Sequence, residues 1–144
     1  MTGAMTGTIT GTITGTVVFD LDGTLADTSA DLIGAANACF QARGLGALLD
    51  PTLDALIAFH GGRAMLRAGY ARLPADTLLP PGAEDEDYPR LLDHYAEGIA
   101  VYTRLYPGAE AALEPLAADG HRLAVCTNKP AALATLLLDS GKGA

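Results

Sequence analysis

Residues 17–29 read VVFDLDGTLADTS, an apolar run that ends on two aspartates two positions apart. Apart from the first aspartate, the stretch Thr16 to Leu21 is β-branched, aromatic or aliphatic, which predicts a strand buried on both faces. Gly23 and Thr24 follow at once, and a glycine here indicates that the strand is already unwinding at Asp22. The two carboxylates therefore stand where a strand gives way to a turn.

A second strand is predicted far along the chain, at His121 to Thr127, and a leucine-rich helix follows from Pro130. Helical patterns lie between the strands, and this order predicts a parallel α/β unit with a right-handed crossover. A simple crossover needs only about a dozen residues. Because about a hundred residues separate Leu21 from Leu123, we expect most of residues 31–105 to form a helical insertion beside the sheet.

The sequence thus divides into three parts. Residues 1–15 carry a Gly-Thr-Ile-Thr type of repeat, interpreted as a low-complexity leader because its glycines weaken any strand. Residues 16–30 and 106–144 are assigned to the α/β core, and residues 31–105 to the insertion. A longer inserted helix is expected to open at Asp87-Tyr88-Pro89, with an aromatic and aliphatic stripe for which core packing is favoured over the wall of a binding cleft. That stripe comprises Tyr88, Leu92, Tyr95, Ile99 and Tyr102.

Polar residues follow both predicted strands: Asp20 and Asp22 the first, Thr127 and Asn128 the second. Ligands of open α/β sheets bind beyond the carboxyl ends of the strands, which is the edge where these residues are expected to meet. Paired carboxylates suit Mg²⁺, and an aspartate can also attack phosphorus while its neighbour transfers a proton. The alternative interpretation of the two aspartates is purely structural, since Asp and Gly are common in turns for conformational reasons alone.

The stretch VVFDLDGTLADT resembles the first signature motif of the haloacid dehalogenase superfamily of phosphohydrolases, and VCTNKP at 125–130 resembles its second. The similarity is closest to the phosphoglycolate phosphatase-like branch, in which a helical cap is inserted between the motifs and a YPG sequence opens the core helix. The resemblance extends over about residues 16–139. It implies a Rossmann-type parallel core, here incomplete, that carries an α-helical cap.

The resemblance implies a role for each residue of the first motif. Asp20 is expected to be the nucleophile and a Mg²⁺ ligand, and Asp22 the general acid/base, which also lends its backbone carbonyl to the metal. Gly23 is expected to let the backbone approach the phosphoryl group, and Thr24 to brace the motif. An aspartate at position 22 favours phosphoryl transfer, because the dehalogenases of the superfamily lack an acid there.

In the second motif, the resemblance implies that Thr127 and Asn128 hydrogen-bond phosphoryl oxygens. Lys129 stands in the same loop and is a candidate phosphate contact. The family also uses a further lysine and a later acidic pair that completes the Mg²⁺ site, and neither is visible in this sequence. Lys129 is a candidate substitute for that lysine, whereas Lys142, the second of two lysines, is expected in a solvated tail.

The resemblance therefore implies a C-terminally truncated chain that lacks at least two βα units of ~30 residues each. In the family, the strand that carries the later acids pairs with the first strand. Its absence would leave one apolar edge bare, which predicts a dimer or a swapped oligomer through that edge. The Gly-Thr-Ile-Thr leader is a candidate to cover part of this edge.

Charge and hydropathy exclude some classes of binding partner. A formal charge of −8 argues against nucleic acid, whose recognition needs a basic face. No apolar run approaches the ~18 residues that cross a membrane, and no signal-peptide pattern is present. Cys39 and Cys126 are expected to be packed thiols in a reducing cytoplasm. We therefore expect a cytoplasmic protein that binds a small phosphorylated substrate and neither nucleic acid nor membrane.

Two classes of function remain open. The first is a Mg²⁺-dependent phosphatase of a small metabolite resembling 2-phosphoglycolate, which works through an aspartyl-phosphate intermediate and is impaired in this chain by the missing groups. Sugar phosphates and nucleotides are rival substrates. The second class is a catalytically inactive remnant, or a complementing fragment, that acts only through binding.

Overall fold

Two short parallel strands, β1 (Thr16–Phe19) and β4 (Arg122–Val125), form the sheet of this protein, whose computed structural model describes residues 15–140. Their register aligns Thr16 with Arg122 and Phe19 with Val125, so both strands end at the same edge. This parallel pairing across a long helical segment confirms the α/β class expected from the sequence. Within residues 15–140, β4 is the strand that pairs with β1 through a parallel ladder.

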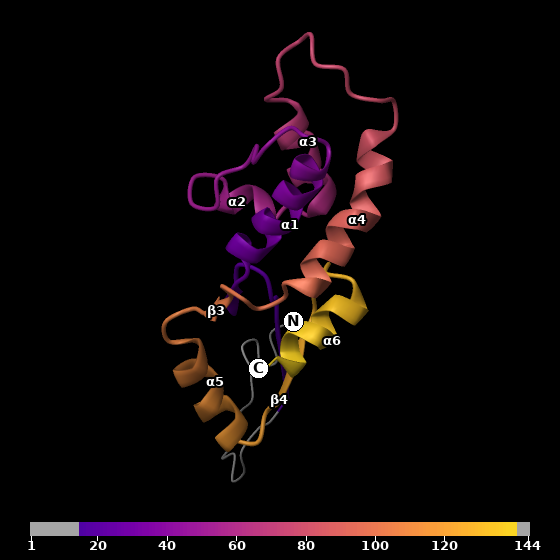
Figure 1. Ribbon diagram of the computed structural model, residues 1–144. Coiled ribbons are helices and arrows are strands. Elements are labelled where there is room, and N and C mark those ends of the chain that lie inside the picture. The colour runs from indigo at the N-terminus through magenta and orange to yellow at the C-terminus, as the bar shows by residue number, and fades with distance from the viewer. Residues whose placement is uncertain (1–14, 141–144) are drawn as a thin grey trace, which may run out of the picture.

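Of the five helices between these strands, the first four gather at one end of the molecule (Figure 1). They are α1 (Ser29–Ala42), α2 (Ala55–Ala58), α3 (Gly62–Tyr70) and α4 (Ala83–Glu97). Their buried side chains form one hydrophobic cluster, in which Ile33, Phe40, Met65, Leu66 and Tyr95 are almost wholly shielded from solvent. We call these four helices the helical group.

A charged residue sits inside the helical group. Asp87 of α4 is 1% exposed and accepts hydrogen bonds from Arg43, at 2.7 and 3.0 Å, from Arg90 at 3.1 Å and from the hydroxyl of Tyr70. Burial alone would raise the pKa of Asp87, but these hydrogen bonds and the charge of Arg43 outweigh it and hold that pKa below its usual value. The buried carboxylate is therefore fully paired, as a stable fold requires.

Two chain segments connect the helical group to the sheet, and they run side by side. The short strands β2 (Ala26–Asp27) and β3 (Arg104–Leu105) pair in an antiparallel ladder, with Ala26 opposite Leu105. Beyond β3 come α5 (Ala109–Ala118) and, after β4, α6 (Ala131–Asp139). A second apolar cluster of Leu21, Leu25, Ala100 and Leu137 lies beneath the helical group.

Helix α6 also packs against the helical group, since its Leu133 belongs to the first cluster. Figure 1 shows α6 beside the sheet-proximal end of α4. The loop that precedes α6 is thereby brought under α4. Within residues 15–140, no helix has the length and apolar character that a bilayer crossing demands.

Some local expectations were wrong. Helix α4 begins at Ala83, before Pro89, and ends at Glu97, so Ile99 and Tyr102 lie outside it. The acidic residues of its first turn pair with arginines of other elements, for example Glu84 with Arg67 at 2.8 Å, and so extend the helix toward its N-terminus.

The strands are also less buried than their composition suggests. Val18 is 58% exposed, and Cys126 is exposed instead of packed. The reason is that only two strands form this sheet in the described part of the chain, so much of its surface stays open. Residues 1–14 of the leader and Lys142 lie outside the described residues, and the domain boundaries stay a prediction.

Candidate functional site

The site forms where β1 and β4 end together. The backbone amide of Cys126 donates a hydrogen bond of 2.8 Å to the carbonyl of Phe19, which extends the strand pairing by one step. Asp20 and Thr127 follow immediately after this bond and line one cavity. Parallel pairing thus delivers the polar residues of both motifs to a single edge.

The turn after β1 is held by one carbonyl. The amides of Thr24, Leu25 and Ala26 lie 3.1 to 3.2 Å from the backbone oxygen of Leu21, whose side chain is fully buried. Gly23 adopts a φ of +76°, which favours glycine, and a Cβ there would lie 3.1 Å from the ring of Phe59. Glycine is therefore required both for the backbone turn and for the close approach of the helical group.

The two aspartates have different environments. Asp20 is exposed, and its Oδ1 accepts a hydrogen bond of 2.8 Å from the amide of Leu21. Asp22 is 19% exposed, and its Oδ1 accepts a hydrogen bond of 2.6 Å from Thr28 and lies 3.1 Å from Nζ of Lys129. Asp20 is thus open to a ligand, whereas Asp22 is fixed beside it by a hydroxyl and a cation.

Lys129 is almost completely enclosed, with 3% of its side chain exposed. Its ammonium also donates a hydrogen bond of 2.9 Å to the hydroxyl of Tyr95 and lies 4.1 Å from the centre of that ring. Burial lowers the pKa of Lys129 below its ordinary value, and the carboxylate of Asp22 opposes this effect. The loop itself is tied by a bond of 3.1 Å from the Lys129 amide to Thr127 Oγ1.

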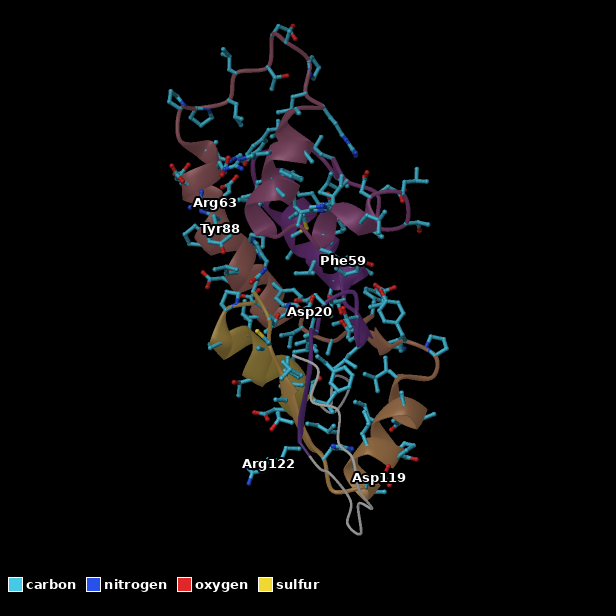
Figure 2. All side chains as sticks on the ribbon, turned by 180° about the vertical axis from the view of Figure 1, so that it is seen from behind. Asp20, Phe59, Arg63, Tyr88, Asp119 and Arg122 are labelled. Atoms are coloured by element: carbon cyan, nitrogen blue, oxygen red, sulfur yellow. The ribbon has the colours of Figure 1, made fainter. Side chains whose placement is uncertain are left out.

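The cavity has a volume of about 160 Å³ and lies between the sheet edge and the helical group. Figure 2 shows Asp20 at this junction with Phe59 on the helical side, while Asp119 and Arg122 lie at the far end of the strands. The polar floor of the cavity is formed by Asp20, Asp22, Thr127, Asn128 and Lys129. Its largely apolar roof includes Ala58, Phe59, His60, Tyr88, Leu91, Leu92 and Tyr95.

Five of the seven residues predicted for the site therefore share one cavity, whereas Gly23 and Thr24 lie in the adjoining turn. The roof residues are not among the predicted site residues, since the sequence favours a core stripe over a binding cleft for Tyr88 and Tyr95. Tyr95 is both buried and a wall of the cavity. Thr28, which stands at the N-cap position of α1, makes no side-chain cap hydrogen bond and instead donates from its hydroxyl to Asp22. The short distance in sequence between Asp22 and Thr28 is the signal from which this hydrogen bond could have been predicted.

The donor set suits one hard cation. In the described part of the chain, no three His, Cys, Asp or Glu side chains come together as a metal cluster. Mg²⁺ is commonly held by one or two carboxylates while water and phosphate supply the other ligands. The open carboxylate of Asp20, at the rim of a small polar cavity, fits that mode of binding.

Comparison with known proteins places this geometry in context. Residues 17–141 match the family model described as haloacid dehalogenase-like hydrolase. The chain is 39% identical to phosphoglycolate phosphatases from Agrobacterium fabrum and from Caulobacter vibrioides. Each similarity includes 85% of this chain, and 51% and 50% of those two proteins. The chain therefore spans about half the length of these curated relatives.

A solved structure of another protein shares the fold of this chain. A crystal structure described as a predicted phosphoglycolate phosphatase from Haemophilus somnus superposes with a TM-score of 0.70 at 26% identity. The superposition includes 92% of this chain and 59% of that one. The similarity thus extends over both the helical group and the sheet.

Proposed function

Because the chain belongs to the haloacid dehalogenase-like hydrolase family, we propose that it carries the nucleophile half of a Mg²⁺-dependent phosphatase for a small phosphorylated metabolite. The observation that carries this proposal is the pair of aspartates: Asp20 is open to the cavity, and Asp22 is held beside it by Thr28 and Lys129. The names of the relatives favour 2-phosphoglycolate as the substrate.

The proposed reaction begins with attack by a carboxylate oxygen of Asp20 on phosphorus. The bond between phosphorus and the substrate oxygen breaks, and Asp22, which must enter the cycle protonated, gives its proton to the departing alkoxide. In the second step Asp22 takes a proton from water, which attacks the aspartyl-phosphate and releases inorganic phosphate. Asp20 returns as a free carboxylate, so atoms and charge balance over the cycle.

The remaining floor residues would hold the transferred group. Thr127 Oγ1 already accepts the Lys129 amide, which leaves its hydroxyl proton to donate to a phosphoryl oxygen. The amide of Asn128 and the ammonium of Lys129 offer further donors in the same cavity. Bound Mg²⁺, held by the Asp20 carboxylate and the Asp22 carbonyl, would supply neutralisation of the phosphoryl charge. The roof would exclude bulk water from the reacting atoms.

A second candidate is a chain that binds phosphate without turning substrate over. It is favoured by the floor of the cavity, where Thr127, Asn128 and Lys129 offer donors to phosphate whether or not turnover follows. In this form the chain would act as a binding fragment or as one part of a complemented enzyme. Within residues 15–140, β1 pairs with β4 along one edge, and its other edge is where a completing partner would join.

The experiment measures phosphate release from 2-phosphoglycolate and from a panel of sugar phosphates and nucleotides, with and without Mg²⁺. Asp20→Asn is compared with Asp119→Asn, which changes the same residue type at the far end of the molecule (Figure 2). Release that needs Mg²⁺, is lost in Asp20→Asn and persists in Asp119→Asn supports the phosphatase. Absence of release together with Mg²⁺-dependent binding of inorganic phosphate, weakened by Thr127→Val, supports the binding fragment. Absence of both release and binding overturns both candidates.

A further inference from the structure

The cation of the cavity is held by a residue from the helical group. Among the described residues that line the cavity, Lys129 is the one lysine or arginine. Its ammonium lies between Asp22, in the turn after β1, and Tyr95, in α4. Three separate segments of the chain therefore meet at one nitrogen atom.

We propose that Tyr95 is a positioning residue, whose buried hydroxyl and ring hold the Lys129 ammonium against Asp22 and beneath the cavity. This inference rests on the proposed function, and it adds a residue of α4 to the machinery of the site. Tyr95 touches neither aspartate through a hydrogen bond and acts through Lys129.

The geometry around Lys129 restricts the position of its ammonium. A lysine side chain has four rotatable carbon bonds, so fixing it costs conformational entropy that its contacts must offset. Tyr95 is 1% exposed, so its ring and hydroxyl are themselves immobilised by the hydrophobic cluster. It offers both a hydrogen-bond acceptor at 2.9 Å and an aromatic face at 4.1 Å. An ammonium so enclosed stays in one place.

The arrangement leaves the cation able to serve a substrate. An ammonium has three donors, of which Asp22 and Tyr95 receive two. The third donor is available to a phosphoryl oxygen in the cavity that Lys129 lines. Lys129 can thus balance the charge of the carboxylate and of a bound phosphate together. Because α4 supplies Tyr95, a shift of the helical group relative to the sheet moves this charge.

The alternative is that the contact only packs α4 onto the loop before α6. The test compares Tyr95→Phe, which keeps the ring and removes the hydroxyl, with Tyr102→Phe. Tyr102 is 69% exposed and lies outside the cavity, so it controls for the loss of a tyrosine hydroxyl. The first readout is the rate of Lys129 acetylation, measured by mass spectrometry relative to Lys142 of the same chain.

We expect Tyr95→Phe to increase the relative acetylation of Lys129 by about fivefold, because an ammonium without its hydroxyl partner reaches solvent more often. Tyr102→Phe is expected to leave the ratio unchanged, and both variants should keep the wild-type melting temperature within a few degrees. An unchanged ratio in Tyr95→Phe overturns the proposal. This readout requires neither substrate nor turnover.

The second readout separates positioning from packing. The Kd for inorganic phosphate in the presence of Mg²⁺ is measured for the wild type, Tyr95→Phe, Lys129→Met and the double variant. We expect about fivefold weaker binding in Tyr95→Phe and no further loss when it is added to Lys129→Met, because the hydroxyl acts through the lysine. Independent, additive losses would contradict the proposal. If the wild type binds no phosphate, the proposed function fails, and the acetylation ratios still decide whether Tyr95 holds Lys129.

Discussion

The carboxylate of Asp31 accepts two hydrogen bonds from Thr103, one from its amide at 2.9 Å and one from its hydroxyl at 2.7 Å. The amide of Tyr102 adds bonds of 3.0 Å. Asp31 lies in the first turn of α1, and Thr103 immediately precedes β3. Together with the pairing of β2 and β3, this contact fastens to each other the two segments that join the helical group to the sheet.

Removal of the Asp31 carboxylate should therefore loosen both connections. We expect Asp31→Ala to reduce the free energy of unfolding by about 3 kcal/mol, because it leaves the fully buried Thr103 without its charged acceptor. Urea denaturation followed by circular dichroism measures the change. Asp93→Ala, at an exposed position of α4, is the matched control and should change stability by less than about 0.5 kcal/mol. Equal losses of unfolding free energy in the two variants would contradict the role of Asp31 in joining the two segments.

Two helical glycines should respond in opposite directions to the same substitution. A Cβ at Gly69 in α3 would lie 2.2 Å from the ring of Phe40, so Gly69→Ala should destabilise the fold by about 2 kcal/mol or more. A Cβ at Gly34 in α1 would meet no atom within 4 Å, so Gly34→Ala should stabilise it by about 1 kcal/mol. Thermal and urea unfolding of both variants measure the difference. A Gly69→Ala protein as stable as the wild type would show that Phe40 packs elsewhere.

Asp54 should contribute to stability in a defined pH window. Hydrogen bonds from Arg72, assisted by the amide of Asp50, lower the pKa of Asp54 from 3.8 to about 2. Because the folded-state pKa lies below the unfolded value, this stabilisation is present above about pH 4 and is lost as the pH falls toward about 2. Stability measured across that window should fall less steeply in Asp54→Asn than in the wild type. Asp76→Asn, at an exposed position, should keep the wild-type slope.

The two cysteines should differ in reactivity. Burial, and secondarily the charge of Asp87, raise the pKa of Cys39 to about 11, whereas Cys126 is exposed at the end of β4. We expect a thiol reagent at pH 8 to label Cys126 at least about a hundredfold faster than Cys39. Cys126→Ser should remove the fast phase and Cys39→Ser should preserve it. Rapid labelling of both thiols in the native protein would contradict the burial of Cys39.

Local rules were sufficient to predict the floor of the site. Asp20, Thr127 and Asn128 follow the ends of predicted parallel strands, and such ends meet at one edge of a sheet in any fold of this class. The strand and helix order likewise follows from hydrophobic pattern and turn residues. The position of Tyr95 over Lys129 could not be predicted in this way. It depends on how α4 crosses the loop before α6, which is a tertiary relationship without a sequence period.

Other features of the fold could not be predicted from the sequence pattern either. The strands β2 and β3 contain two residues each, too few to show an alternation. The true beginning of α4 at Ala83 depends partly on Arg43, just after α1, and Arg67, in α3, which pair with its acidic first turn and are distant from it in sequence. The exposure of Cys126 depends on the number of strands beside it, which composition does not report.

The pairing of β1 with β4 also has a consequence for how the chain folds. Thr16 lies opposite Arg122, so closing this ladder from an extended chain confines a loop of about a hundred residues and carries a large entropy cost. The contacts among α1 to α4 span shorter separations, and the Ala26 to Leu105 pairing brings the two ends of that segment together. We therefore expect the helical group to form first and to act as the template on which the strands meet, with sheet formation as the slow phase of refolding.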